Sequence, residues 1–439
     1  MAPLSRTVLL AYALPGVPLA MLSLPVYVFV PQVYASTFGL SLAGIGLVLL
    51  TVRLFDAITD PFVGYVSDAF EIRGERRRPY LLIAIIPVVL GTWMVMRPPG
   101  EPGYLYLALW SAVLSIGWTL AIIPYNAWGA ELSQDYAGRN RVTGYREGLV
   151  VVGTVIAASL PAVLPPLGLQ GEAAVLAVIA LIVAITVPIT FMIAIFAVPE
   201  PQNFSWRSIA WREGLGVMRR NGPFKRLIVA FVLNGFANGL PASLFLFFSA
   251  DVLQAGAAQG PLLLLYFVCG ILGIPLWFRV SSAVGKHRSW CFAMIVACAA
   301  FICVPFLGAG DIIPFAIICV ITGLALGADL TLPASMQADV IDADTVESGS
   351  QRSAVYFSAW SMATKITLAL AAGVALPTLD LFGYVPNSES TDGLFALAIL
   401  YSLVPTLFKL AAIALMWGFP LTEDAQSNLR KQIEQEQTA

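Results

Sequence analysis

The segment Arg53-Leu-Phe-Asp56-Ala-Ile-Thr-Asp60-Pro61 places three charged side chains inside an apolar run that extends from residue 42 to residue 66. About 20 mostly apolar residues are enough to cross a bilayer, so this run predicts a membrane-spanning helix. Charges at that depth are expensive and mark functional sites. Asp56 and Asp60 are four residues apart and share one face of the helix, and Arg53 lies near the same face.

The two aspartates of this segment suggest a cation site. Two carboxylates held close together repel each other when both are ionised, which raises the affinity for a proton or a small cation between them. Thr59 can add a hydroxyl oxygen, which suits a hard cation such as Na⁺. The alternative is an inert buried pair in which Arg53 neutralises one aspartate, but that leaves the second aspartate unexplained.

The rest of the chain resembles this segment in its apolar character. Hydrophobic residues make up 59% of the 439 residues and charged residues only 11%, against roughly 25% charged in soluble domains. Lipid is therefore the expected solvent, and the predicted fold class is an all-α integral membrane protein. Twelve spans are predicted, near residues 9–37, 42–66, 79–97, 104–130, 146–165, 173–198, 225–250, 260–280, 289–308, 312–336, 353–377 and 394–419.

The basic residues are distributed unequally between the loops. If the N-terminus is cytoplasmic, nearly all Lys and Arg outside the spans fall in cytoplasmic segments, and the opposite loops hold only Arg97. This asymmetry is the pattern of the positive-inside rule. It predicts a multi-pass protein of a cell inner membrane with both termini in the cytoplasm.

The chain divides near its middle. A polar linker, 199–224, separates a six-helix half (1–198) from a second half (225–420), and a polar tail (421–439) follows. A weak repeat relates the halves, because Pro124 and Glu131 end span 4 as Pro333 and Asp339 end span 10. Parallel repeats of six helices with a site between them are the pattern of the major facilitator fold, which is the predicted architecture.

Several other functions lack support. There is no Gly-rich phosphate loop, no nucleophile with a plausible histidine base, and no metal-ligand spacing among the five cysteines. A net charge of −2 gives no indication of nucleic-acid binding. We therefore expect no enzyme activity, no cofactor, no metal beyond possible Na⁺ at Asp56 and Asp60, a small-molecule substrate, the lipid bilayer as partner, and a monomer.

Further polar side chains lie inside the other spans. Lys365, mid-way along span 11, needs an anionic partner, for which the span 2 aspartates are the natural candidates; snorkelling to an interface is the alternative. Lys409 lies nearer a span end, so snorkelling or packing is as plausible as a functional role. The candidate substrate contacts are Arg53, Asn126, Arg146, Asn234, Asn238, Asp329 and Trp360.

Alternatives stay open for these contacts. Arg146 could bind substrate or brace a cytoplasmic gate where it opens span 5, and Asp329 could face substrate or pair with a neighbour. Asn234 and Asn238, with nearby glycines and Pro241, suggest a broken or bent helix with amides aimed inward. A hydrogen bond between helices is the alternative. The histidine, His287, is expected to be solvated.

Two stretches carry a family resemblance. Residues 53–61, followed by Gly64, Gly74, Arg77, Arg78 and Pro79, and the segment from Pro333 to Lys365, resemble the glycoside–pentoside–hexuronide:cation symporters, the melibiose-permease branch of the major facilitator superfamily. In that family the span 2 aspartates bind the coupling cation and the span 11 lysine contacts them. The resemblance implies these roles for Asp56, Asp60 and Lys365, a cation-site role for Thr119, and a sugar-binding role for Arg146.

The chain also departs from the melibiose type. Ile122 replaces an aspartate of span 4, Asn126 replaces a tryptophan, and the span 1 stretch 18–21 lacks a Lys-Asp pair that grips sugar. We therefore expect symport of a small polar solute, such as a sugar or sugar derivative, coupled to H⁺ rather than Na⁺, because one carboxylate suffices for a proton. The alternatives are a carrier of an amphiphile or organic anion and, from other classes, a membrane sensor or membrane-embedded enzyme.

Overall fold

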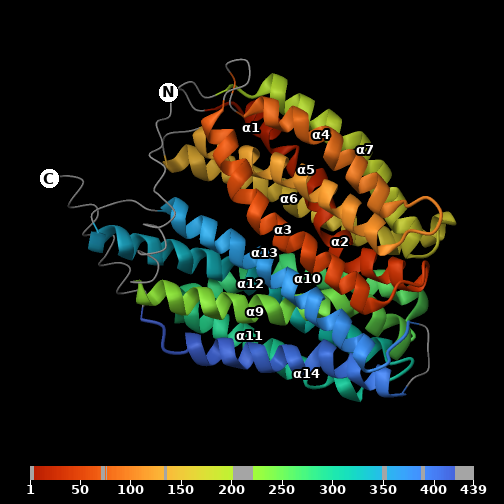
Figure 1. Cartoon of the computed structure of the whole chain (residues 1–439). Coiled ribbons are helices and arrows are strands. Elements are labelled where there is room, and N and C mark those ends of the chain that lie inside the picture. Colours follow the sequence, from red (N-terminus) through yellow and green to blue (C-terminus); the bar gives the residue numbers. More distant parts are fainter. Residues whose placement is uncertain are drawn as a thin grey trace. The chain divides into compact units, whose positions relative to one another are not determined.

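The described chain is built from long α-helices (Figure 1). The computed structural model describes residues 4–70, 75, 77–132, 136–200, 221–348, 353–386 and 391–420. Its helices are α1 (Arg6–Ala13), α2 (Gly16–Ser36), α3 (Leu42–Ala69), α4 (Arg78–Met96), α5 (Tyr104–Glu131), α6 (Tyr136–Val163), α7 (Glu172–Ala197), α9 (Gly222–Phe247), α10 (Gln259–Val284), α11 (Lys286–Phe301), α12 (Ile312–Ser348), α13 (Ser353–Leu381) and α14 (Thr391–Met416).

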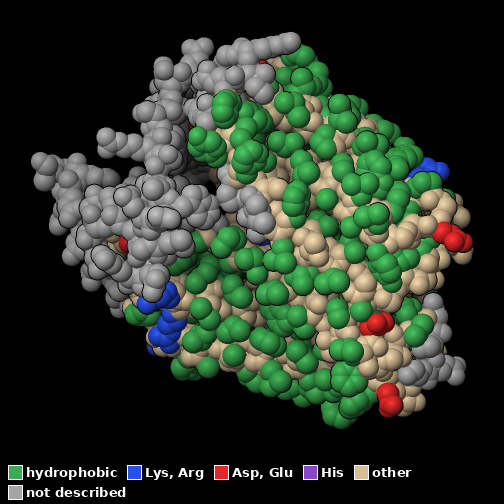
Figure 2. Space-filling view, in the orientation of Figure 1, with side chains coloured by type: hydrophobic (Ala, Val, Ile, Leu, Met, Phe, Trp, Pro, Cys, Tyr) green, Lys and Arg blue, Asp and Glu red, His purple; other side chains and the backbone are tan. Residues whose placement is uncertain are grey.

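Every predicted span coincides with a helical segment, which confirms the all-α membrane fold. Among the described helices, eleven are long and apolar enough to cross a membrane by length and composition; α3, which carries the charges of span 2, is not among the eleven. Large apolar side chains such as Leu105, Phe196 and Ile86 are exposed. Figure 2 shows hydrophobic side chains over most of the described surface in view, as expected for a surface that faces lipid.

Some boundaries differ from the prediction. The first predicted span consists of two helices, because the helix is interrupted at Leu14 and Pro15 before α2 begins. α6 begins ten residues before the predicted start at 146, and α12 continues past 336 to Ser348. Hydropathy marks only the apolar part of a helix, whereas its polar turns can continue where water is available. Residues 201–220 of the predicted linker and the whole tail, 421–439, lie outside the described residues.

The chain forms two compact units. The N-terminal unit comprises Met1–Trp206, Gln259–Pro261 and Ala372–Leu381, and the C-terminal unit comprises Arg207–Ala258, Leu262–Ala371 and Phe382–Ala439. In the N-terminal unit α4 packs against α5 and α7, and α2 packs against α6. In the C-terminal unit α14 packs against α9 and α11, and α11 also packs against α12.

Each unit contains an ion pair at a corresponding place, which is buried in the N-terminal unit and partly exposed at Lys286 in the C-terminal unit. In the N-terminal unit, Arg77 pairs with Glu131 at the end of α5, with 3.1 Å between Arg77 Nε and Glu131 Oε2. In the C-terminal unit, Lys286 Nζ lies 2.6 Å from Asp339 Oδ2. Both basic residues follow the second span of their half, and both acids follow the proline of the fourth span. The weak repeat in the sequence thus has a structural counterpart in each unit.

The end of α1 packs tightly against α5 through a pair of tyrosines. The rings of Tyr12 and Tyr125 stack with centroids 4.8 Å apart. The Tyr12 hydroxyl donates to the backbone carbonyl oxygen of Tyr125 at 3.0 Å, and the Tyr125 hydroxyl donates to that of Tyr12 at 2.8 Å. Gly129 makes room for this arrangement, because a Cβ there would lie 1.9 Å from the Tyr12 hydroxyl oxygen.

Gly129→Ala is expected to lower the stability of the protein by about 1–3 kcal/mol, because an added methyl must displace the Tyr12 hydroxyl from a close-packed core. The thermal midpoint of the detergent-purified protein measures this effect. Gly144→Ala, on α6, is the matched control, since its added Cβ would meet nothing within 4 Å. Equal midpoints for the two variants would show that α1 yields easily at this contact.

Candidate functional site

Asp56 is the centre of a polar cluster between α3 and α5. It is buried, with 2% of its side chain exposed, and its Oδ2 lies 2.9 Å from Arg53 Nη1. Ser115 of α5 donates its hydroxyl hydrogen to Asp56 Oδ1. Arg53 also lies over the ring of Tyr27, 4.7 Å from the centroid. The cation over an aromatic face and the ion pair together hold Arg53 in place.

Asp60 lies one helical turn further along α3 and meets a second hydroxyl of α5. Thr119 is fully buried and donates to Asp60 Oδ1 at 2.7 Å. The structure therefore brings together three of the predicted cation-site residues, Asp56, Asp60 and Thr119. Thr59 differs, because its hydroxyl donates to the backbone carbonyl of Asp56 at 3.3 Å.

Ser115 is the residue of this cluster that the sequence interpretation missed. It precedes Thr119 by four residues, so the two hydroxyls share one face of α5. That spacing is the signal that could have identified it. The carboxylate and hydroxyl oxygens of α3 and α5 are ligands that a hard monovalent cation prefers, and either carboxylate can take up a proton. Among the described residues, no group of three or more His, Cys, Asp or Glu is arranged to hold a metal ion.

Arg146 and Asn126 lie together, although they come from different helices. Arg146 Nη1 donates to Asn126 Oδ1 at 2.7 Å, and Arg146 Nη2 lies 2.7 Å from Glu147 Oε1. Arg146 does not open its helix as expected, since α6 begins at Tyr136. The guanidinium is a planar set of donors that can bind a carboxylate or phosphate in two-pronged fashion.

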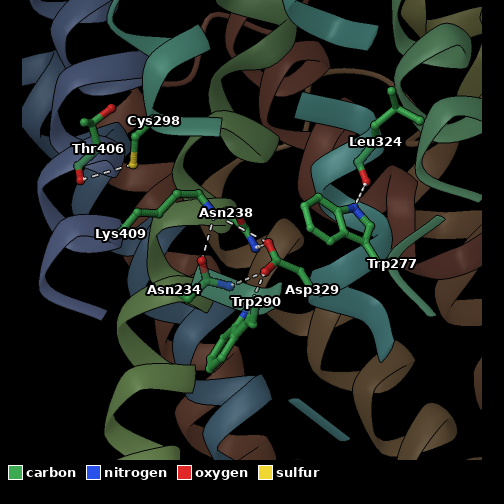
Figure 3. A network of polar contacts seen from close by, with 9 residues as sticks. All are labelled: Asn234, Asn238, Trp277, Trp290, Cys298, Leu324, Asp329, Thr406 and Lys409. Atoms are coloured by element: carbon green, nitrogen blue, oxygen red, sulfur yellow. Dashed lines mark hydrogen bonds and ion pairs between the residues drawn. The ribbon is translucent and has the colours of Figure 1, made fainter. Parts of the chain in front are cut away.

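The C-terminal unit holds a second polar cluster, centred on Asp329 of α12 (Figure 3). Asp329 Oδ1 accepts from Asn234 at 3.0 Å and from Trp290 at 2.6 Å. Its Oδ2 accepts from Asn238 at 2.8 Å and from Lys409 at 3.4 Å. Lys409 also donates to Asn234 Oδ1 at 2.7 Å. The structure thus groups three of the candidate substrate contacts, Asn234, Asn238 and Asp329.

The structure decides one open alternative for this unit and contradicts one expectation. Of the roles left open for Lys409, snorkelling is excluded, because only 2% of its side chain is exposed and its ammonium group pairs with Asp329. His287 is buried rather than solvated, with its ring centroid 6.3 Å from that of Phe419. Opposite charges inside a membrane tend to pair, so the pairing of Lys409 with Asp329 could have been proposed from the sequence. Nothing in the sequence pointed to Trp290.

The glycines near the two asparagines serve close packing instead of a break. α9 is helical from Gly222 to Phe247 without interruption. A Cβ on Gly235 would lie 2.8 Å from Thr367, and one on Gly239 would lie 2.6 Å from Ala371. These residues let α9 and α13 approach each other closely.

The two remaining candidates lie on α13. Trp360 stacks on Phe231 of α9, with ring centroids 3.9 Å apart. Lys365 is half-buried in the C-terminal unit, whereas Asp56 and Asp60 belong to the N-terminal unit. The pairing of Lys365 with these aspartates stays a prediction.

Comparison with known proteins gives the family. A family model described as MFS/sugar transport protein matches residues 11–423. The sodium-dependent lysophosphatidylcholine symporter 1-A of Danio rerio is 22% identical over 430 residues, which cover 88% of this chain and 80% of that protein. The glucuronide carrier protein homolog of Escherichia coli (strain K12) is 22% identical over 405 residues, which cover 90% of this chain and 88% of that protein.

A solved structure shares the fold. The bacterial homolog to the human lysosomal transporter Spinster has a TM-score of 0.67 and 16% identity, and the match covers 97% of each chain. At that identity the likeness concerns the fold alone. The match of the family model covers nearly the whole chain and agrees with the family resemblance carried by residues 53–61. This chain therefore belongs to the MFS/sugar transport protein family and is a multi-pass membrane transporter of the major facilitator superfamily.

Proposed function

We propose that this transporter is a symporter that couples the uptake of a solute to a cation bound at Asp56 and Asp60. The observation that carries the proposal is the pairing of each carboxylate of α3 with a hydroxyl of α5, Ser115 at Asp56 and Thr119 at Asp60. Ionisable groups kept inside a membrane helix mark ion pathways. We also infer, from the basic loops, a cell inner membrane with both termini cytoplasmic.

A proton is the proposed coupling ion. A single carboxylate is enough to carry a proton, whereas a sodium ion needs a set of several oxygen ligands. Sodium is the second candidate, and two observations favour it. Ser115 adds a hydroxyl oxygen to the cluster, and several relatives are named sodium-dependent symporters.

The proposed solute is a small polar molecule with an acidic group, such as a sugar derivative. Relatives are named for glucuronides, lysophosphatidylcholine and sphingosine-1-phosphate, and all three compounds carry a carboxylate or phosphate. Arg146, held by Asn126 and Glu147, is a suitable donor for such a group. An amphiphile is the second candidate, because the stretch 18–21 in α2 lacks charged residues.

Uptake into proteoliposomes tests the coupling ion. With phenyl glucuronide as the solute, we expect accumulation driven by an inward proton gradient in sodium-free buffer, and loss of accumulation when a proton ionophore is added. Lysophosphatidylcholine is the parallel test solute for the hypothesis that the protein transports an amphiphile. Uptake that requires Na⁺, and that ignores the ionophore while the sodium gradient is held, would replace the proton by sodium at Asp56 and Asp60.

A further inference from the structure

We propose that the two asparagines of α9 have opposite roles, with Asn234 an internal brace and Asn238 a contact that offers its amide oxygen to an O–H or N–H group of the transported solute. The proposal rests on the proposed function only in assuming that a solute is bound. It assigns separate tasks to two residues of the same type that are four positions apart.

Asp329 is a saturated acceptor and is therefore unsuited to contact a solute. Its two oxygens accept hydrogen bonds from Asn234, Asn238, Trp290 and Lys409, at 2.6 to 3.4 Å. An ionised carboxylate only accepts hydrogen bonds, and four donors fill its ordinary capacity. The ammonium group of Lys409 balances its charge. Asp329 is thus a fixed negative charge around which its neighbours are oriented.

That fixed charge determines which end of each amide faces it. A carboxylate attracts an NH₂ group and repels a carbonyl oxygen, so both asparagines turn Nδ2 toward Asp329. The oxygen of Asn234 is also occupied, because it accepts from Lys409 Nζ at 2.7 Å. Asn234 is buried, with 3% of the residue exposed. Both its amide nitrogen and its amide oxygen form hydrogen bonds inside the unit.

Asn238 differs from Asn234 in both respects. It is half-buried, and its oxygen accepts no hydrogen bond from any residue that the structure describes. Asn238 follows Phe231 by seven residues, so the two lie on one face of α9, about 10 Å apart along its axis. Trp360 stacks on Phe231 at that face. An aromatic platform and an acceptor at this spacing suit a solute with a ring and a hydroxyl, such as a glycoside.

Cysteine labelling tests the exposure of the two positions without any solute or coupling ion. Asn238→Cys and Asn234→Cys are each made in a Cys303→Ser background, which removes the exposed native cysteine. Because thiol labelling follows exposure, a charged methanethiosulfonate should modify Asn238→Cys at least about tenfold faster than Asn234→Cys. If Asn234→Cys fails to fold, buried Cys298 is the reference. Equal rates would overturn the proposal.

A matched pair of leucine variants tests the contact itself, with phenyl glucuronide and lysophosphatidylcholine as probes. Each variant removes one donor from Asp329, but only Asn238→Leu removes the oxygen offered to the solute. We expect Asn238→Leu to weaken binding about tenfold, the effect of one lost hydrogen bond. Asn234→Leu should lower the thermal midpoint and leave binding below that midpoint nearly unchanged. The reverse pattern would overturn the assignment.

The two proposals fail in different ways. Uptake that ignores both proton and sodium gradients, with a clear labelling difference between the two positions, would refute cation coupling and leave the assignment of Asn238 intact. Normal coupling together with equal labelling rates would refute the assignment of Asn238 alone.

Discussion

Lys409→Met is expected to destabilise the protein by about 3–5 kcal/mol, because it leaves the carboxylate of Asp329, only 10% exposed, without its counter-charge. Asp329 would keep its hydrogen bonds from Asn234, Asn238 and Trp290. Neutral donors replace only part of the solvation that an ion loses on burial. The expected result is a large drop in the thermal midpoint of the purified protein and in its yield from membranes.

The double variant Asp329→Leu/Lys409→Met separates charge from packing. Replacing both members of a buried ion pair by apolar residues is often neutral for stability, so the double variant should recover most of the midpoint lost by Lys409→Met. Lys225→Met, at an exposed position of α9, is the control for loss of a positive charge. A double variant no more stable than Lys409→Met would show that packing around the lysine stem, rather than its charge, dominates.

Asp60→Asn and Asp56→Asn are each expected to abolish concentrative uptake, with a loss of about hundredfold or more in the accumulation ratio. An amide keeps the shape of the carboxylate but has no charge and takes up no proton near neutral pH, so the coupling ion loses its binding group. Downhill exchange of labelled solute should persist in one of the two variants, because exchange needs no net ion movement.

Glu101→Gln is the control for these variants, because Glu101 is exposed and lies in the loop before α5. It should accumulate solute as the parent does. Accumulation that persists in both Asp56→Asn and Asp60→Asn would remove the cation site from α3 and direct attention to other ionisable groups. The measurement is the ratio of internal to external solute in proteoliposomes under an imposed ion gradient.

The fold was readable from the sequence because a bilayer imposes a simple requirement. A spanning helix must be long and apolar, so composition along the chain was enough to place segments such as 79–97 and 173–198. The ends were less predictable. Packing and local water determine the helix interruption at Leu14 and Pro15 and the early start of α6. Average hydropathy reports neither of these influences.

The candidate site was predictable only along single helices. Asp56 and Asp60 could be grouped because they are four residues apart on one helix. Thr119 came from the family resemblance, and Ser115, one turn before it, follows from the same reasoning. Lys409 and Asp329 are 80 residues apart on different helices. Their contact depends on how α12 and α14 pack, which periodicity along the chain does not record.

The matching ion pairs of the two units allow equivalent positions of the two halves to be compared. Arg77 and Lys286 are 209 residues apart, as are Pro124 and Pro333. At that offset Asp56 and Asp60 fall on Leu265 and Cys269, and Asp329 falls on Leu120. If one ancestral half was duplicated, its copies have kept the peripheral ion pair and have diverged in their intramembrane charges. Each intramembrane charged cluster therefore occurs in one half only. A mutation that removes either cluster cannot be compensated by the equivalent positions of the other half.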